Sequence, residues 1–352
     1  MADRAPAVGP AGPHRSRRRR RPGPTGGGGC LDHRPTARAA RSTGQRSLES
    51  RSVRVIAVAG STGFVGRHLV RRLAGQGAAV RGLARDAMTA QRLLQSSVEI
   101  VQADLLEPVT LSVAMQGVDV VVHCAAITAD HKEAYRGEYA RVNGEGTRNL
   151  VAAARRAGVK KIVLLNGLGT KPGSDGSYMR TRWEMAEAVR GSGLAWVSPQ
   201  PSILFGNGAP FPAAIAKLAR TSPVVPILGS GRTKLQPLWV EDLCLCLALC
   251  VEKPTWDGRA MDLGGPEQLP YTEVVRLILE AAHRRRPMVP VPLPLARIAA
   301  GGMSVLPNPP LVPATLELFD FDNATDLDSV QKIFGFAPRS MRTHLQEHGL
   351  DG

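Results

Sequence analysis

The sequence predicts an α/β fold in which a doubly wound parallel sheet is followed by a smaller C-terminal α/β lobe. Three observations predict it. Apolar, β-branched stretches alternate with amphipathic stretches of helical period from residue 53 to about residue 205, which is typical of parallel strands joined by right-handed crossovers. A glycine-rich turn separates the first expected strand from the first expected helix. Beyond residue 205 the alternation gives way to Pro- and Gly-rich sequence.

The individual elements follow from the period of the apolar residues. β-Branched runs predict strands, and apolar residues three or four positions apart predict helices. The expected strands cover residues 53–59, 79–84, 98–102, 118–123 and 161–165, and a sixth opens at 195–197. The expected helices cover residues 66–74, 87–94, 111–116, 138–157 and 178–191. We therefore expect a first domain over residues 53–205, with one sheet covered by helices on both faces.

Residues 206–352 are expected to form the smaller lobe. Helical periods recur there at 240–251, 271–282 and 340–347, between Pro-rich connections. In open parallel sheets, ligands bind in the crevice at the carboxyl ends of the strands. We therefore expect this lobe to cover that edge and to contact a substrate or a partner.

Residues 1–52 differ in composition from the rest of the chain. They contain 12 arginines and three acids, so they carry +9 of the formal net charge of +15. They are nearly free of large apolar residues, so they cannot bury enough surface to offset the entropy of ordering. We expect a disordered tail, or upstream sequence that does not belong to the native protein. No specific nucleic acid is expected as a partner, and nucleic-acid binding through this tail stays an alternative.

Two further features bound the class of protein. No apolar run approaches the length of about 20 residues that a membrane helix needs, so we expect a cytoplasmic protein, at most peripheral to the inner face of the membrane. The odd number of cysteines and the absence of a C-x-x-C pair argue against a disulfide framework or a metal site. We expect the clustered cysteines to be small core residues. The cysteines are Cys30, Cys124, Cys244, Cys246 and Cys250.

The most informative motif is Ala57-Val-Ala-Gly60-Ser-Thr-Gly63-Phe-Val-Gly66, which places three glycines between a strand and a helix. The first glycine permits a tight turn, the second lets the backbone approach a pyrophosphate, and the third allows close packing of helix on sheet. Free N–H groups and the positive dipole at the helix N-terminus favour phosphate oxygens. The motif predicts a dinucleotide site formed by Gly60, Ser61, Thr62, Gly63, Phe64, Val65 and Gly66.

The glycine spacing, G-x-x-G-x-x-G, resembles the short-chain dehydrogenase/reductase superfamily in its extended and atypical branches. The resemblance runs from about Val53 to the C-terminus and implies a Rossmann-type fold that binds NAD(P). Where related NAD enzymes carry an acid for the ribose 2′-hydroxyl, this chain has Ala84, followed by Arg85. A guanidinium suits a 2′-phosphate by charge and by bidentate geometry. NADP(H) is therefore the expected cofactor, and NAD(H) is the alternative, with Asp86 binding the ribose.

Two pairs of residues resemble further cofactor contacts of the superfamily. Asp104 and Leu105 follow the third expected strand, at the position of the pair that contacts adenine. Ala125 and Ala126 follow the fourth, where small residues let the backbone pass close to the nicotinamide ribose. The resemblance implies that all four line the dinucleotide.

Active members of the superfamily use a Ser or Thr, a Tyr, and a Lys four residues after the Tyr. In this chain the resemblance places the tyrosine at Tyr178 and puts Arg182 at the lysine position. An arginine supplies charge and hydrogen bonds to a ribose, but it does not deprotonate and so cannot join a proton relay. The hydroxyl position after the fifth strand reads Asn166-Gly167, and Asn166 could donate one hydrogen bond to a carbonyl. A degenerate reaction centre of Tyr178, Arg182 and Asn166 is expected.

The segments 178–187, 201–206 and 334–341 resemble bacterial relatives of the nucleotide-binding accessory subunit of respiratory complex I. The resemblance implies an NADP(H)-binding protein with a structural or redox-sensing role. An unknown small-molecule or quinone-related partner is also expected, the latter from the apolar stretch 290–300. The alternative is an active NADPH-dependent reductase, dehydrogenase or sugar-nucleotide epimerase that uses Tyr178. The apolar, proline-punctuated stretch 290–300 is compatible with core packing or with peripheral membrane association.

Overall fold

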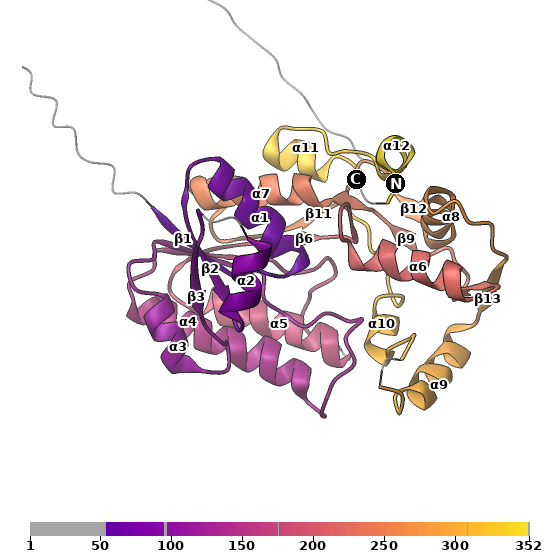
Figure 1. The fold of residues 1–352 in the computed structure, drawn as a ribbon, viewed down its shortest axis with the longest axis horizontal. Coiled ribbons are helices and arrows are strands. Elements are labelled where there is room, and N and C mark those ends of the chain that lie inside the picture. Colours follow the sequence, from indigo (N-terminus) through magenta and orange to yellow (C-terminus); the bar gives the residue numbers. More distant parts are fainter. Residues whose placement is uncertain (1–53, 95–96, 175, 308, 351–352) are drawn as a thin grey trace, which may run out of the picture. The chain divides into compact units, whose positions relative to one another are not determined.

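The protein is built around a seven-stranded parallel sheet (Figure 1). The structure, a computed structural model, describes residues 54–94, 97–174, 176–307 and 309–350. The strand order is β11-β6-β5-β4-β1-β2-β3. The strands are β1 (Val55–Ala59), β2 (Ala79–Ala84), β3 (Glu99–Gln102), β4 (Val120–His123), β5 (Lys161–Leu164), β6 (Ala195–Pro201) and β11 (Arg259–Leu263). The expected α/β fold is therefore confirmed. The expected tail, residues 1–52, lies outside the described residues.

The helices of the first half of the chain connect successive strands. They are α1 (Phe64–Gly75), α2 (Ala87–Leu93), α3 (Pro108–Ala114), α4 (Gly146–Arg156) and α5 (Ser177–Arg190). Two of them differ from the expectation. Helix α3 begins at Pro108 rather than at 111, because proline is tolerated in a first helical turn. The helix expected over 138–157 begins with a π-helical segment, η1 (Ala140–Glu145), before α4.

Alternate residues of the strands pack into two separate cores. Ile56 and Val58 of β1 face a core shared with α1 and a later helix, α7 (Val240–Glu252). Ala57 and Ala59 face the opposite core, formed with α3, α4 and α5. Because successive side chains of a strand point to opposite faces, both faces of the parallel sheet are covered by helices, as such sheets require.

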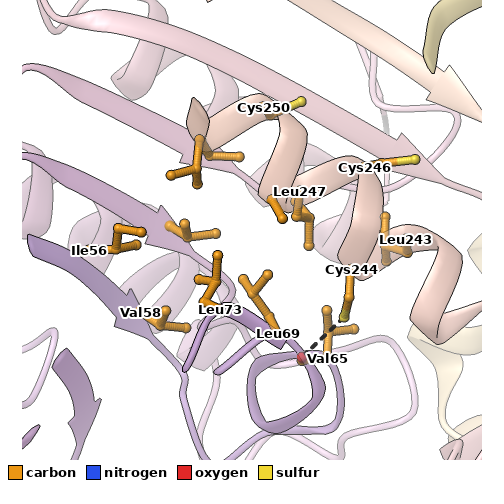
Figure 2. Close-up of a cluster of buried hydrophobic side chains, with 14 of the residues drawn as sticks. Ile56, Val58, Val65, Leu69, Leu73, Leu243, Cys244, Cys246, Leu247 and Cys250 are labelled. Atoms are coloured by element: carbon orange, nitrogen blue, oxygen red, sulfur yellow. Dashed lines mark hydrogen bonds between the residues drawn. The ribbon is translucent and has the colours of Figure 1, made fainter. Parts of the chain in front are cut away.

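The core between α1 and α7 contains three of the cysteines (Figure 2). Cys244, Cys246 and Cys250 are fully buried among leucines and valines, and Cys244 Sγ lies 3.8 Å from the carbonyl oxygen of Val65. Burial raises the pKa of the Cys250 thiol to about 12 and that of Cys244 well above its usual value. The expectation that these cysteines are core residues is confirmed, whereas Cys30 lies outside the described residues.

After β6 the chain leaves the central sheet, and it returns to the sheet later with α7 and β11 (Arg259–Leu263). Helix α7 packs on α1, and β11 pairs with β6 in register Arg259↔Val197 to form the edge of the sheet. In Figure 1, α7 lies beside α1, and β11 lies beside β6. Residues beyond 205 therefore contribute to the central sheet as well as to a second group of elements.

That second group has its own core. Its helices are α6 (Pro210–Thr221), α8 (Tyr271–Ala281), α9 (Leu293–Met303), α10 (Pro313–Glu317) and α12 (Met341–His348), while α11 (Ser329–Phe334) and the 3-10 turn η2 (Pro254–Trp256) pack nearer the sheet. Short strands form three pairs, namely β7 (Leu204–Phe205) with β10 (Leu238–Trp239), β8 (Val225–Leu228) with β13 (Met288–Val291), and β9 (Lys234–Leu235) with β12 (Leu269–Pro270). Its buried residues include Phe205, Ile215, Ile227, Val274, Ile278 and Leu316.

Buried polar groups connect this group to the end of β6. Ser202 Oγ donates to the carbonyl oxygen of Asn323 at 2.6 Å and accepts from the N–H of Gln236 at 3.1 Å. The Gln236 amide donates to the carbonyl of Gly265 and accepts from the N–H of Thr325. These side chains are therefore structural. Within the part of the chain that is described, no helix is both long and apolar enough to span a bilayer.

Candidate functional site

Two of the three glycines of the β1–α1 turn, Gly60 and Gly66, stand where a side chain does not fit. Gly60 has a φ of 80°, and a Cβ there would lie 2.8 Å from Cα of Ala125. A Cβ on Gly66 would overlap the carbonyl oxygen of Gly60. The turn therefore packs directly against the backbone that follows β4. From β1 the chain continues to β2 and β3 on one side and later to β4, β5 and β6 on the other. Ligands of open α/β sheets bind where the strand order reverses in this way.

The N-terminus of α1 is open to a ligand. Gly63 is its N-cap, no side chain bonds the first turn, and that turn contains no acid. The side chain of Ser61 points elsewhere, because its Oγ donates to the carbonyl oxygen of Leu83 at 2.9 Å. Phe64 packs edge-on against His68. The Ser61 hydroxyl is thus committed to β2, and Ser61 can offer a ligand its backbone.

Two charged residues, Arg85 and Asp86, follow the end of β2. Arg85 is exposed, and none of the described residues forms an ion pair with it. Asp86 is the N-cap of α2, where its carboxylate accepts from the backbone N–H and hydroxyl of Thr89. These bonds hold the pKa of Asp86 below its usual value. The acid at this position is therefore engaged by its own helix, and the guanidinium is available.

The loop after β3 is fixed by two hydrogen bonds that involve side chains. Asp104 accepts from the N–H of Leu106 at 2.8 Å, and the carbonyl of Leu105 accepts from the Asn149 amide at 3.0 Å. These bonds orient the Asp104 carboxylate and the Leu105 backbone at the carboxyl edge of the sheet. Their strand, β3, pairs with β2, which in turn pairs with β1.

Ala125 and Ala126 are held through the residue that follows them. The side chain of Asn143, in the π-helical segment, accepts from the N–H of Ile127 at 2.9 Å and donates to its carbonyl at 3.1 Å. Asn143 is fully buried and also donates to Thr181 Oγ1 at 3.4 Å. A single amide therefore joins the β4 loop to α5, and a π-helical turn at such a position is common at functional sites.

Tyr178 lies in the first turn of α5 inside a small apolar cluster. Its ring packs edge-on against Tyr139, with ring centres 5.7 Å apart, and the cluster also contains Val312 and Phe321 from beyond the second group's α9. The guanidinium carbon of Arg182 lies 5.7 Å from the centre of the Tyr178 ring. The structure thus brings Tyr178 and Arg182 together, one helical turn apart.

Arg182 is a buried cation. It is 7% exposed, and its buried Nε has no hydrogen-bond partner in the part of the chain that the structure describes. None of the described residues forms an ion pair with it, and its Nη1 lies 4.0 Å from Met185 Sδ. A buried charge without a partner is costly. Beside it, burial and the charge of Arg182 lower the pKa of His123 to about 3.

Asn166 is turned toward the protein. Its amide nitrogen donates to the carbonyl oxygen of Arg182 at 3.0 Å, and its amide oxygen accepts from the N–H of Gly167 and from Thr170 Oγ1. The residue is 2% exposed. Asn166 therefore fixes the β5 loop to α5, and this geometry differs from the expected hydrogen bond to a substrate carbonyl.

A carboxylate from a distant segment caps α5. Glu317, at the end of α10, accepts from the backbone N–H groups of Tyr178 at 3.3 Å and Met179 at 3.0 Å. Gly176 precedes the helix, and a Cβ there would overlap the Glu317 carboxylate. The second group of elements therefore positions the helix that carries Tyr178 and Arg182.

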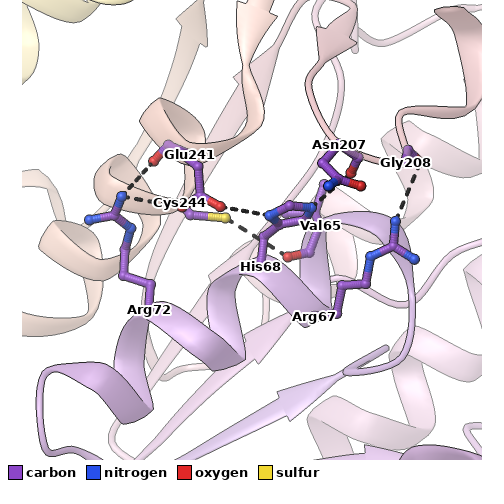
Figure 3. A network of polar contacts seen from close by, with 8 residues as sticks. All are labelled: Val65, Arg67, His68, Arg72, Asn207, Gly208, Glu241 and Cys244. Atoms are coloured by element: carbon purple, nitrogen blue, oxygen red, sulfur yellow. Dashed lines mark hydrogen bonds and ion pairs between the residues drawn. The ribbon is translucent and has the colours of Figure 1, made fainter. Parts of the chain in front are cut away.

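A second polar network fixes the helix that follows the glycine turn (Figure 3). His68 Nδ1 lies 2.6 Å from Glu241 Oε1, and its Nε2 lies 3.0 Å from the carbonyl oxygen of Asn207. Arg72 also donates to Glu241, at 3.3 Å. The hydrogen bond from His68 holds the pKa of Glu241 below its usual value. Helix α1 is thereby tied both to α7 and to the loop before α6.

Several of these groups were not expected from the sequence. Asn143, His123, His68 and Glu317 lie in ordinary helices, strands or loops, and their partners are far along the chain. An Asn-Gly pair inside an expected helix is the one local irregularity that could have pointed to Asn143. Glu241 lies in the first turn of α7, where the helix dipole favours an acid, but that position does not reveal its partner His68.

Comparison with known proteins agrees with this geometry. A family model described as NAD(P)H-binding matches residues 60–216. The chain is 29% identical over 300 residues to an NAD(P)H azoreductase of Xenophilus azovorans, covering 84% of this chain and 98% of that protein. It is 31% identical over 230 residues to a ceramide reductase of Caulobacter vibrioides, covering 65% of this chain and 70% of that protein.

Two more distant similarities complete the comparison. The mitochondrial NADH dehydrogenase (ubiquinone) 1 alpha subcomplex subunit 9 of Arabidopsis thaliana is 23% identical over 322 residues, covering 89% of this chain and 79% of that protein. The epimerase Mth375 of Methanothermobacter thermautotrophicus has the same fold, with a TM-score of 0.67 at 20% identity over 83% of this chain and 90% of that one. The glycine turn, the strand order and these matches together place the chain in the NAD(P)H-binding, extended short-chain dehydrogenase/reductase family.

Proposed function

We propose that the protein binds NADP(H) at the glycine turn and holds it in a structural or redox-sensing role, as an accessory protein of the complex I type. The observation that carries this proposal is the buried guanidinium of Arg182, which lacks a carboxylate partner among the described residues while the neighbouring Asn166 amide is committed to its backbone. Such a centre can bind a dinucleotide firmly, but it is poorly equipped to move a proton.

The residues present fit a dinucleotide. The open N-terminus of α1 would hold the phosphates, because its N–H groups and dipole favour anions. Arg85 is exposed at the end of β2 and has no ion-pair partner among the described residues, so it would hold a 2′-phosphate. The Nε–H of Arg182, which has no hydrogen-bond partner among the described residues, would donate to a ribose hydroxyl oxygen, which would offset part of the cost of burying the charge.

The same residues argue against rapid turnover. A bound nicotinamide supplies hydride chemistry, and a carbonyl that receives hydride also needs a proton. Tyr178 carries the one acidic hydroxyl beside Arg182 in the described site, and an arginine does not relay protons to it. Asn166 presents its amide to Arg182 and to its own loop, not to a substrate.

An active NADPH-dependent reductase is the second candidate. Two observations favour it. The guanidinium carbon of Arg182 lies 5.7 Å from the centre of the Tyr178 ring, so a cation stands beside the side chain that carries the hydroxyl. The bacterial relatives from Xenophilus and Caulobacter are named as reductases. In this case Tyr178 would donate the proton to the reduced substrate.

Nucleotide choice is tested by titrating the purified protein with NADPH and NADH and following ligand fluorescence. Arg85→Gln is expected to weaken NADPH binding about tenfold, because one bidentate charge-assisted contact is lost, and to leave NADH binding unchanged. Arg92→Gln, at an exposed position on α2, is the matched control and should change neither. Tighter binding of NADH than of NADPH by the unmodified protein would contradict the proposal.

The two roles are separated by a second experiment. Protein purified without added nucleotide is analysed for what co-purifies, and reduction of offered carbonyl, quinone and azo compounds by NADPH is measured. The accessory role predicts tight nucleotide with negligible turnover. The reductase role predicts turnover that collapses in Tyr178→Phe while nucleotide binding persists, so measurable turnover that survives this substitution rules out the tyrosine mechanism.

A further inference from the structure

The outward face of α9 is apolar. Ala296 and Ala300 face the protein, whereas the positions on the opposite side of the helix are Pro294, Leu295, Ile298, Gly301 and Gly302, all exposed. Leu295 is 57% exposed and Ile298 is 73% exposed. A helix on the surface of a water-soluble domain normally presents polar residues on that side. The exposed side of α9 is thus built for an apolar neighbour.

The apolar face continues into the loop after the helix. Val305 is 84% exposed and Leu306 is also exposed. The loop is fixed in place, because Lys132 Nζ donates to the carbonyl oxygen of Leu306 at 2.7 Å. Clustered large apolar side chains on a surface mark interaction sites, while isolated ones do not. We name the face formed by 294–306 the α9 surface.

The chain around the α9 surface is basic. Residues 281–316 contain four arginines and no Asp or Glu. Arg284, Arg285 and Arg286 precede β13, and Arg286 Nε donates to the carbonyl of Ala219 at 2.9 Å, which brings the cluster to the end of α6 near Arg220. Arg297 of α9 pairs with Asp320. The segment therefore joins exposed arginines to an apolar helix face, and this combination complements a surface that is apolar inside and anionic outside.

We propose that the α9 surface binds an anionic phospholipid bilayer, with α9 lying along the interface, Leu295 and Ile298 in the acyl region, and the 284–286 arginines against the headgroups. Interfacial helices combine these same features. An eleven-residue helix is about 16 Å long and 10 Å wide, far below the roughly 800 Å² per partner of a stable protein interface. A lipid surface therefore fits this helix better than a second copy of the chain. The proposal does not depend on which nucleotide is bound.

The test is co-sedimentation of the full chain with vesicles. One set contains phosphatidylcholine with phosphatidylglycerol, and the other contains phosphatidylcholine alone. The double substitution Leu295→Glu/Ile298→Glu is expected to lower partitioning onto the anionic vesicles about tenfold or more, because the inserted apolar groups are lost. The matched control is Val109→Glu/Val113→Glu on α3, where the two valines are 79% and 59% exposed. It changes the net charge equally and should retain most of the binding.

Arg284→Gln/Arg285→Gln is expected to lower binding to anionic vesicles while leaving thermal unfolding unchanged. Circular dichroism of every variant shows that each one folds. Three results would overturn the proposal: the unmodified chain fails to bind anionic vesicles; the α9 and α3 pairs lose binding equally, so that net charge or the 1–52 tail accounts for it; or the α9 pair instead dissociates a dimer seen by light scattering.

Discussion

Glu317 caps the helix that begins at Ser177 by accepting a hydrogen bond from the backbone N–H of Met179 at 3.0 Å. The two residues are 138 positions apart in the chain. An acid at a helix N-terminus satisfies a free N–H group and interacts favourably with the helix dipole. The orientation of Tyr178 and Arg182 therefore depends on a residue of the C-terminal group of elements.

Glu317→Ala is expected to lower the free energy of unfolding by about 1 kcal/mol, because the cap is lost, and to weaken nucleotide binding. The melting temperature should fall by about 2–4 °C. The control is Glu187→Ala on the same helix, which removes an exposed ion pair with Arg190 and should cost much less. Equal melting temperatures for the two variants would show that the cap contributes nothing.

The glycine turn offers a comparison within one helix. Gly66→Ala is expected to destabilise the protein by about 1–3 kcal/mol and to abolish nucleotide binding, because its Cβ would overlap the Gly60 carbonyl. Gly75→Ala, at the end of the same helix, meets open space and should stabilise by up to about 1 kcal/mol. Urea unfolding and NADPH titration measure both effects. Nucleotide binding by Gly66→Ala at the unmodified affinity would contradict the close packing.

The Glu241 network predicts a pH dependence. The folded-state pKa of Glu241 lies below its usual value of 4.5, chiefly because of the hydrogen bond from His68. The stability that the ionised Glu241 carboxylate contributes to the folded state is therefore fully present above the usual pKa. It is lost as the pH falls through the lowered folded-state pKa. Glu241→Gln should cost about 1–2 kcal/mol at pH 7, and the difference should narrow below about pH 4.5. Urea unfolding of both proteins between pH 7 and about pH 4 measures the difference in the free energy of unfolding. A difference that grew as the pH fell would contradict the prediction.

The buried cysteines predict slow thiol labelling. Cys244, Cys246 and Cys250 are fully buried, and burial raises the pKa of each thiol. Because the thiolate is the reactive form, labelling with iodoacetamide at pH 8 should follow the rate of unfolding. Mass spectrometry identifies the labelled positions, with protein in 6 M guanidinium, roughly the concentration that unfolds most domains, as the reference. Prompt labelling of Cys246 in the folded protein would contradict the core described.

Local patterns in the sequence predicted the strands, the glycine turn and the family. They succeed because each depends on neighbouring residues, such as Gly60, Gly63 and Gly66 between an apolar strand and a helix. Helix α6 was missed because Pro210 and Pro212 indicate a loop, although prolines are compatible with a first helical turn.

The supports of the site could not be predicted in this way. Glu317 acts on Met179, and Glu241 acts on His68 from 173 positions away. The commitment of Asn166 to the Arg182 carbonyl is equally a property of the folded chain. Sequence periodicity carries no information about which distant acid will meet which helix end.

The late return of the chain to its sheet has a consequence for synthesis on the ribosome. A nascent chain that has emerged through residue 205 contains every strand of the sheet except the one at the edge, β11. Until residues 259–263 emerge, β6 presents unpaired backbone groups, and an uncovered edge is a site for association with other chains. Chaperone demand and losses to aggregation should therefore be greatest for ribosomes paused between these two points, and early termination there should give insoluble product.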